Sequence, residues 1–302
     1  MGLFDSLKKL FAGGGGPKRR KPLRRTDISK RFDLRGRTGQ GSMSKVYQAY
    51  DNKIGRNVCL KILDKAKTAK FEERFVTQGL IKPSEGVICM ALRHPNLVTT
   101  FEHGLSQTGE PYLVMEWIDG LGLNYLIETK NPLLKGNRVN FVAQLADAVA
   151  YLHSQKFLHR DLCPRNVMVD KHGVVKLIDF GLTIPYTPEY CRPGNRTGTA
   201  DYLAPEIIKR MTTDHRIDLF ALGVTAYEVF TGQLPWERTM SSEETLRRHL
   251  NTPPRNPKEL LPDLDDDITA LLLRAIERDA KARFPTAQAF KVALESLGRT
   301  DY

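Results

Sequence analysis

The hydrophobic pattern of this chain changes period after its first third, and this change constrains the fold more than any other feature. Between residues 46 and 117, short apolar runs separated by turn residues predict four strands, over residues 46–50, 57–63, 96–101 and 112–117. Beyond residue 120, apolar residues recur at helical spacing, most strongly over residues 139–154, 216–231 and 268–279. We therefore predict an α+β fold with two lobes, a small β-rich N-lobe and a larger helical C-lobe, with a cleft between them.

The first 31 residues differ in composition from the rest of the chain. Residues 1–35 hold eleven Lys and Arg against three Asp, a balance of +8, which leaves only +3 of the net charge of +11 for the other 267 residues. A basic excess confined to one end argues against a nucleic-acid-binding domain as the main function. We predict a basic, flexible tail with a short amphipathic helix over residues 1–31, then one folded domain over residues 32–298. The N-lobe is expected to span about residues 32–118 and the C-lobe about residues 119–298.

Two polar segments in the helical part carry groups that phosphoryl transfer needs, namely a base and ligands for a metal ion. Residues 159–166 read HRDLCPRN, in which the Asp161 carboxylate can accept a hydroxyl proton and the Asn166 amide oxygen can bind a hard metal ion. Thirteen residues later Asp179 opens the sequence DFG and offers a second metal ligand. Either segment alone could arise by chance. Both together, in this order and spacing, indicate phosphoryl transfer.

Two features of the β-rich part fit the same chemistry more weakly. Gly39 and Gly41 lie between predicted strands, where backbone N–H groups could close over phosphate oxygens. Taken alone, this segment is better explained as an ordinary hairpin turn. Lys61 lies in an apolar strand and could contact phosphates if a carboxylate held it, although a solvated strand lysine is the simpler interpretation of that residue by itself.

In combination, these segments resemble the eukaryotic-type protein kinase family over about residues 32–298, and more specifically its serine/threonine kinases. The resemblance implies the two-lobed protein kinase fold with ATP bound between the lobes, Mg²⁺ as cofactor and proteins as substrates. It implies that Asp161 is the base, that Asn166 and Asp179 bind Mg²⁺, and that Lys61 anchors phosphates with Glu85 as its partner. It implies further nucleotide contacts from residues of both lobes: Gly39, Gly41, Ser44, Val46, Cys59, Met115, Glu116, Ile118 and Met168.

The resemblance extends to structural positions of the C-lobe. Glu206, which ends the sequence APE, is expected to pair with Arg283. Asp218 is expected to brace the catalytic loop, residues 159–166. Thr199, which follows a glycine, stands where serine/threonine kinases form the substrate-docking turn.

Four residues depart from the family pattern. Ser44 replaces the third glycine of the phosphate loop, and Pro83 lies two residues before Glu85, so the helix that carries Glu85 is expected to start late or bend. Cys163 stands where serine/threonine kinases usually have a lysine that contacts the γ-phosphate, and a neutral thiol cannot supply that charge. Arg165, two residues later, resembles the arginine of many tyrosine kinases and is expected to compensate as a catalytic residue.

The segment between Asp179 and Glu206 contains hydroxyls that could be phosphorylated. In related kinases the arginine corresponding to Arg160 collects a phosphate on this segment. Thr197 is nearest to the docking turn and is the favoured autophosphorylation site. The other hydroxyls that we considered are those of Thr183, Tyr186, Thr187 and Tyr190.

Three other functions compete with a serine/threonine kinase. Cys163 and Pro83 keep open a pseudokinase that binds nucleotide and partners as a scaffold, and Arg165 keeps open a tyrosine or dual-specificity kinase. A small-molecule kinase of related fold is disfavoured, because the segment that ends at Glu206 builds a surface for docking peptides.

The sequence also carries expectations about location. The four cysteines form no C-x-x-C pair, no apolar run is long enough to span a membrane, and no secretory signal is evident, so we expect a cytoplasmic protein. The N-terminal MGLFDS matches a myristoylation pattern and is followed by a basic run, which predicts peripheral attachment to an anionic membrane surface. A solvated tail with no such attachment explains the same residues.

Overall fold

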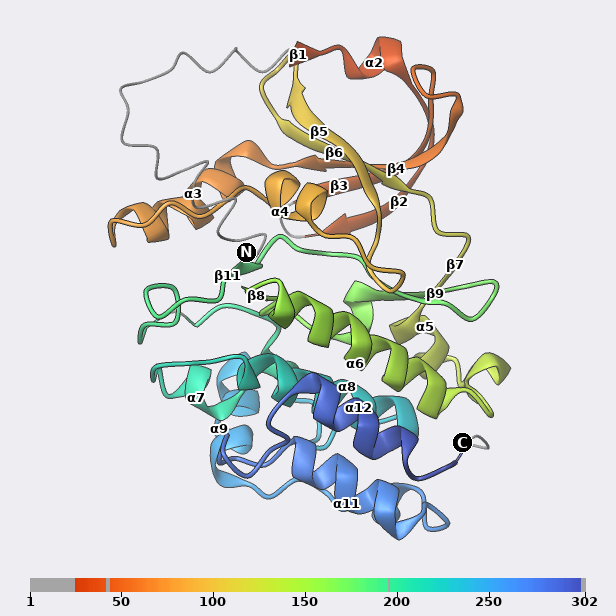
Figure 1. The fold of residues 1–302 in the computed structure, drawn as a ribbon, viewed down its shortest axis with the longest axis vertical. Coiled ribbons are helices and arrows are strands. Elements are labelled where there is room, and N and C mark those ends of the chain that lie inside the picture. The colour runs from red at the N-terminus through yellow and green to blue at the C-terminus, as the bar shows by residue number, and fades with distance from the viewer. Residues whose placement is uncertain (1–24, 42–43, 195, 300–302) are drawn as a thin grey trace. The chain divides into compact units, whose positions relative to one another are not determined.

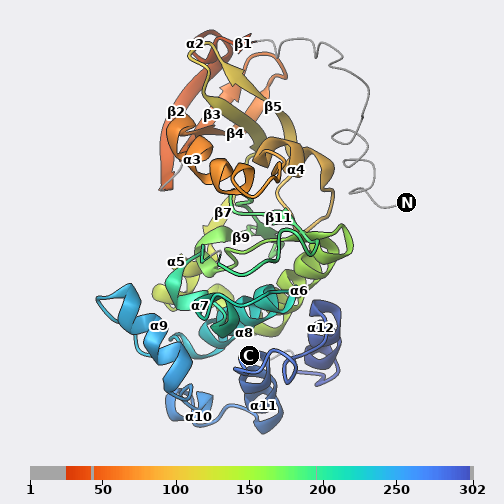
Figure 2. The same cartoon turned by 90° about the vertical axis from the view of Figure 1, so that its left-hand side faces the viewer.

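The computed structural model describes residues 25–41, 44–194 and 196–299, which form two compact units. The N-terminal unit comprises the described residues up to His94 together with Val98–Asp119, and the C-terminal unit comprises Pro95–Leu97 and the described residues from Gly120 onward. Figure 1 and Figure 2 show strands dominating the first unit and helices dominating the second. The predicted α+β composition is therefore confirmed.

The N-terminal unit is built on a six-stranded sheet in the order β1-β5-β6-β4-β3-β2. Its strands are β1 (Arg25–Thr26), β2 (Phe32–Gly41), β3 (Ser44–Asp51), β4 (Arg56–Leu63), β5 (Thr100–Ser106) and β6 (Pro111–Glu116). All neighbouring strands are antiparallel except β1 and β5, which run parallel. Three helices accompany the sheet: α2 (Ile28–Arg31), α3 (Lys65–Val76) and α4 (Glu85–Ala91).

The alternation of side chains along the strands divides the sheet into two faces. One face carries a hydrophobic cluster of buried side chains, formed by Phe32, Ala49, Val58, Leu60, Tyr112 and Val114. Residues at the intervening positions of the same strands, including Lys61 on β4, point to the opposite face, where α4 packs on β5. The sheet thus separates a hydrophobic core from the face that presents Lys61.

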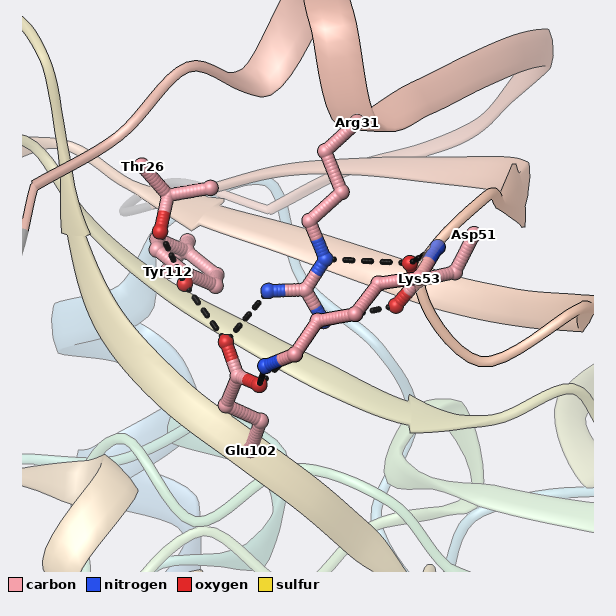
Figure 3. A network of polar contacts seen from close by, with 6 residues as sticks. All are labelled: Thr26, Arg31, Asp51, Lys53, Glu102 and Tyr112. Carbon is pink, nitrogen blue, oxygen red and sulfur yellow. Dashed lines mark hydrogen bonds and ion pairs between the residues drawn. The ribbon is translucent and has the colours of Figure 1, made fainter.

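The segment just before the predicted domain boundary is part of the folded N-terminal unit. Residues 25–31 were assigned to a flexible tail, but β1 adds a strand to the edge of β5 and α2 is capped by the Asp27 side chain. Figure 3 shows the Arg31 guanidinium reaching two carboxylates, those of Asp51 and Glu102. Ion pairing of Arg31 to two different strands holds this segment on the sheet, which local sequence pattern could not reveal.

The strand predicted over residues 96–101 is wrong at its start. β5 begins at Thr100, whereas Pro95–Leu97 belong to the C-terminal unit. The Asn96 amide nitrogen donates to the Gln144 side chain and to the Val175 carbonyl, both at 2.9 Å. These contacts tie residues 95–97 to the C-terminal unit and take them out of the sheet.

The C-terminal unit is mostly helical. Its helices of four or more residues are α5 (Leu123–Glu128), α6 (Arg138–Ser154), α7 (Pro205–Ile208), α8 (Arg216–Thr231), α9 (Ser242–Asn251), α10 (Pro257–Leu260), α11 (Asp266–Ala275) and α12 (Ala287–Glu295). Short strands complete it: β7 (Gly120–Gly122), β8 (Phe157–Leu158), β9 (Val167–Asp170), β10 (Val175–Leu177) and β11 (Ile184–Pro185). In this unit α6 packs against both α8 and α12, and α11 packs against α8.

Helix α8 is buried on nearly all sides, as expected of a helix that is apolar all round. At Gly223 a side chain would not fit, since an added Cβ would lie 2.7 Å from the Ala275 Cβ on α11. Helix α11 ends at Ala275, four residues before the predicted end. The reason is that the Arg283 side chain donates to the carbonyls of Glu277 and Arg278, so the backbone there does not continue the helix.

Among the described residues, no helix combines the length and the apolar character needed to span a bilayer. The predicted amphipathic helix, acylation pattern and basic run of the tail lie outside the described residues.

Candidate active site

A buried ion pair joins the sheet and helix α4 in the N-terminal unit. Lys61 Nζ on β4 lies 2.6 Å from the Glu85 carboxylate, and the two side chains are only 5% and 6% exposed. A lone charge at this depth would be costly, so each group stabilises the other. Glu85 is the first residue of α4, which begins after Pro83, so the expected late start of this helix is present.

Four of the residues expected at the nucleotide lie on one face of the sheet. Val46 is paired with Lys61, and Cys59 is paired with Met115. Directly paired residues point to the same face, and positions two apart on a strand share that face. Burial raises the pKa of the Cys59 thiol to about 11 despite the nearby charge of Lys61, so this thiol is neutral. Val46, Cys59 and Met115 carry no charge, so Lys61 is the charged group among these four residues.

The glycine segment forms the turn between β2 and β3. Gly39 is paired with Val46 and Gly41 with Ser44, which is buried. The tip, residues 42–43, lies outside the described residues. The structure therefore places Gly39, Gly41 and Ser44 in one hairpin at the end of the strands that carry Val46 and Lys61.

The segment expected to face adenine follows directly from β6. The Glu116 backbone N–H donates to the Thr99 carbonyl at 2.9 Å, and the Glu116 carboxylate accepts from the Thr99 N–H at 2.7 Å. This two-way contact fixes the end of β6 next to Met115. Ile118 is buried two residues later. In the C-terminal unit, Met168 is half-buried on β9, where it pairs with Gly122 of β7.

The Asp161 carboxylate is held on both of its oxygens. Its Oδ1 accepts from the Thr199 backbone N–H at 2.9 Å and from the Thr199 hydroxyl at 2.8 Å. Its Oδ2 accepts from the Asn166 amide nitrogen at 3.1 Å, and the same nitrogen donates to the Asp161 carbonyl at 2.8 Å. The Asn166 nitrogen is thus committed to Asp161, and the amide oxygen is the atom left to bind a metal ion.

Thr199 as a partner of Asp161 was not predicted, because the two residues lie 38 positions apart. The signal in the sequence was the glycine before it. Gly198 has a φ of +134°, and an added Cβ would lie 2.7 Å from the Arg160 carbonyl oxygen. A glycine is required for Thr199 to approach the catalytic loop.

Asp218 braces the catalytic loop from α8, as expected. It is fully buried and accepts from the backbone N–H groups of His159 at 2.8 Å and Arg160 at 2.9 Å. The His153 imidazole makes a third contact at 2.8 Å. Burial by itself would raise the pKa of Asp218, but these hydrogen bonds and charges outweigh it and hold that pKa below its ordinary value. The brace supports a strained backbone, since Arg160 has a φ of +69°.

His153 was not singled out from the sequence. It lies on α6, and its only signal was a histidine within a helix that is otherwise largely apolar on its buried side. A contact between two helices 65 residues apart was needed to reveal its role.

Asp179 and the two residues after it form a compact turn. The Gly181 N–H donates to the Asp179 carboxylate at 2.9 Å. Phe180 is 1% exposed, and its ring lies 5.5 Å from that of His159 in an edge-to-face arrangement. The Ile178 N–H donates to the Asn166 carbonyl at 3.0 Å, which ties the segment before Asp179 to the catalytic loop.

The donor set fits magnesium bound together with a nucleotide. Among the described residues, there is no cluster of three or more His, Cys, Asp or Glu side chains that could form a metal cage from protein alone. Mg²⁺ does not require one, because it is commonly bound by one or two protein oxygens together with phosphates and water. Asn166 and Asp179 supply hard oxygen ligands of this type.

The two departures in the catalytic loop differ in exposure. Cys163 is 1% exposed, and burial, with a further contribution from Asp161, raises the pKa of its thiol to about 11. It is a neutral, buried thiol. Arg165 is exposed on the short 3-10 turn Pro164–Asn166.

The segment from Asp179 to Glu206, called the activation segment below, is anchored at both ends. After Asp179, β11 pairs antiparallel with β8, directly before the catalytic loop. At the other end Arg283 donates to both carboxylate oxygens of Glu206, at 2.8 and 2.9 Å, so the expected pair is present. Of the hydroxyls considered for phosphorylation, that of Thr183 is fully buried, whereas Thr197 is half-buried.

Comparisons with known proteins agree with this arrangement. Residues 32–293 match the family described as the protein kinase domain. The chain is 30% identical to the serine/threonine-protein kinase pkn3 of Myxococcus xanthus over 90% of its own length and 51% of that protein. It is also 30% identical to the serine/threonine-protein kinase PknB of Mycolicibacterium smegmatis, over 88% of this chain and 43% of PknB. The chain thus spans about half the length of the curated relatives that it matches.

Proposed function

The chain belongs to the protein kinase family, and on that premise we propose that it transfers the γ-phosphoryl group of ATP to serine or threonine hydroxyls of proteins. The observation that carries this proposal is the geometry of Asp161. Both oxygens of its carboxylate are held, one by Thr199 and the other by Asn166. A carboxylate fixed in this way, beside the segment that ends at Glu206, is suited to orient an incoming hydroxyl.

Asp161 would act as the base. Its carboxylate accepts a hydrogen bond from the substrate hydroxyl and directs the hydroxyl oxygen at the γ-phosphorus. As the new O–P bond forms, the bond from the γ-phosphorus to the bridging oxygen breaks and ADP leaves with that oxygen. The hydroxyl proton passes to Asp161.

The other residues would position phosphates and metal. When bound, Mg²⁺ neutralises the phosphate charge that develops as ADP leaves. The Asn166 amide oxygen and the Asp179 carboxylate would hold that ion. The Lys61 ammonium, oriented by Glu85, would contact the α- and β-phosphates.

The hydroxyl specificity is proposed from the docking turn and the relatives. Thr199, which lies at the predicted docking turn, contacts Asp161 directly, and the relatives named above are serine/threonine kinases. Cys163 supplies no charge, since its thiol is buried and neutral. We propose that Arg165, the exposed cation two residues later, contributes positive charge near the γ-phosphate.

Incubation with Mg²⁺ and γ-labelled ATP, followed by mapping of the label by mass spectrometry, tests the function. We expect label on serine or threonine, with Thr197 as the first site, and a loss of at least about a hundredfold in an Asp179→Ala control. Label on Tyr186 or Tyr190 would instead establish tyrosine specificity. No label on the protein or on general protein substrates, together with measurable ATP binding, would contradict the proposal and favour a scaffold.

A further inference from the structure

A row of three side chains crosses the sheet beneath helix α4. Lys61 on β4 is paired with Leu113 on β6, and Leu113 is paired with His103 on β5. Directly paired residues point to the same face, so all three side chains project toward the helix side of the sheet. Leu113, in the middle, is buried. One end of the row is the phosphate-anchoring lysine and the other is a histidine to which no role has been assigned.

Helix α4 meets both ends of this row with consecutive residues. Glu85 reaches Lys61 at 2.6 Å, and Gly86 lies directly against the His103 imidazole. A Cβ built on Gly86 would lie 2.5 Å from the ring Cγ and 2.6 Å from the Cβ of His103. Real Cβ atoms do not approach other atoms this closely, so with any side chain at residue 86 the helix and His103 could not both keep their present positions.

The glycine is present for space and not for backbone conformation. Gly86 is not among the residues with positive φ, so an alanine could adopt its backbone geometry. A glycine inside a helix costs about 1 kcal/mol relative to alanine, and such a position usually has a packing reason. The three heavy atoms nearest to the added Cβ all belong to His103.

Local interactions do little to fix the start of α4. The helix has seven residues, and its N-cap Ser84 makes no side-chain capping hydrogen bond. Short helices depend on tertiary packing for their stability. The position of Glu85, in the first turn, therefore depends on what the helix packs against.

The strand that carries His103 is itself held from the other face of the sheet. Glu102, the preceding residue, contacts Arg31, and it accepts from Lys53 at 2.6 Å and from the Tyr112 hydroxyl at 2.8 Å. Figure 3 shows these groups converging on Glu102. Because neighbouring residues on a strand point to opposite faces, this network fixes β5 while His103 faces the helix.

We propose that His103 and Gly86 are positioning residues whose contact sets the distance of α4 from the sheet, so that Glu85 reaches Lys61. This inference rests on the proposed kinase activity, in which Lys61 anchors phosphates. His103 acts as a spacer: its ring fills the volume that a larger residue at position 86 would need. Adding a methyl group at position 86 while removing the side chain at position 103 should therefore restore the contact between α4 and the sheet.

Three variants test this spacing: Gly86→Ala, His103→Gly and the double variant, because only glycine at position 103 removes the Cβ that would lie 2.6 Å from a Cβ at residue 86. Gly86→Ala should displace α4 and reduce kcat by roughly 10- to 100-fold, since small misplacements of a catalytic constellation are costly. His103→Gly should cause a smaller loss. The double variant should recover most of the activity lost in Gly86→Ala, because the new methyl group occupies space vacated by the whole His103 side chain, including its Cβ. Gly36→Ala is the matched control, since a Cβ there meets nothing within 4 Å and the residue is exposed.

Two further readouts separate positioning from general stability and from the proposed function. Thermal unfolding reports whether each variant is folded, and hydrogen exchange of the amides of residues 85–91 reports the placement of α4 without any need for activity. We expect faster exchange in Gly86→Ala and recovery in the double variant. If Gly86→Ala does not fold, a double variant that folds is itself the expected rescue.

Wild-type kcat and exchange in a folded Gly86→Ala variant would overturn the inference, as would a double variant no better than Gly86→Ala. If the wild-type protein transfers no phosphoryl group, the proposed function is refuted. Hydrogen exchange at α4 would still test whether His103 and Gly86 set the position of the helix.

Discussion

At the scale of single residues, the site depends on charges that are buried but fully partnered. Asp218 keeps its carboxylate ionised in a fully buried position because two backbone N–H groups donate hydrogen bonds to it and the His153 imidazole contacts it. Arg283 is a positive charge that is likewise buried and fully partnered. Its guanidinium is fully buried and donates to Glu206 and to three backbone carbonyls. A buried charge without a partner destabilises the folded state. Removing one member of a buried ion pair therefore lowers stability, because the other charge is left buried and unpaired.

Replacing Arg283 should therefore be far more damaging than replacing a partly exposed partner of an ion pair. We expect Arg283→Met to lower the free energy of unfolding by about 3–5 kcal/mol, because Glu206 and the carbonyls lose their donor. Lys291→Ala, which removes a partly exposed pair with Asp147, should cost less than about 1 kcal/mol. Urea unfolding at neutral pH measures both. Equal losses in the two variants would show that the buried pair is not an anchor of the activation segment.

At the scale of elements, the segment β1–α2 shows how a few polar contacts attach a short element to a sheet. Residues 25–31 precede the matched family region, and none of the residues of α2 is buried. The segment is held by pairing of β1 with β5 and by Arg31, which reaches Asp51 and Glu102. Burial alone would raise the pKa of Glu102, but Arg31, Lys53 and Tyr112 outweigh it and hold that pKa at about 2.

The stability supplied by this network should depend on pH. Glu102 has an ordinary pKa of 4.5, so the depressed native value contributes stability that is present above pH 4.5 and is lost as pH falls toward 2. We expect Arg31→Met to cost about 3 kcal/mol at pH 7, since it also leaves the buried Asp51 without its cation. The cost should shrink at pH 3.

Urea unfolding of both proteins at pH 7, 5 and 3 measures this dependence. Arg25→Met is the matched control, because its contact with the Gln107 carbonyl is exposed. A loss for Arg31→Met that is the same at pH 3 and pH 7 would contradict the assignment of the stabilisation to the Glu102 carboxylate.

At the scale of the whole molecule, charge is distributed unevenly along the chain. Most of the net charge of +11 lies in the first 35 residues, of which residues 1–31 precede the matched family region. A basic run of this kind is attracted to anionic lipid, and the attraction weakens as salt screens it. The remainder of the chain, close to neutral, has no comparable electrostatic reason to bind such a surface.

Flotation with anionic vesicles tests the membrane expectation for the tail. The intact protein should float with the vesicles at low salt, less so at high salt, and less with neutral vesicles. A variant that lacks residues 1–24 should remain in the soluble fraction. Equal recovery of the two proteins with anionic vesicles would remove the expectation.

Much of the fold could be predicted because its elements depend on the local spacing of apolar residues. The period of the apolar residues located β3, β4, β6, α6 and α8 to within a few residues. The order and spacing of the HRDLCPRN and DFG segments indicated the family that the comparison then matched. Errors arose where distant contacts decide the outcome: residues 95–97 leave the sheet because Asn96 bonds to Gln144 and Val175, and α11 stops early because Arg283 takes the carbonyls that follow it.

The chemical groups that are available could be identified from residue type and motif order, which are properties of the chain alone. Which group meets which depends on how the chain folds. Thr199 holds Asp161 across 38 residues, His153 holds Asp218 across 65, and Gly86 makes room for His103. None of these pairs has a local signature, because each depends on where packed elements bring side chains together in space, and periodicity along one segment carries no information about its distant neighbours.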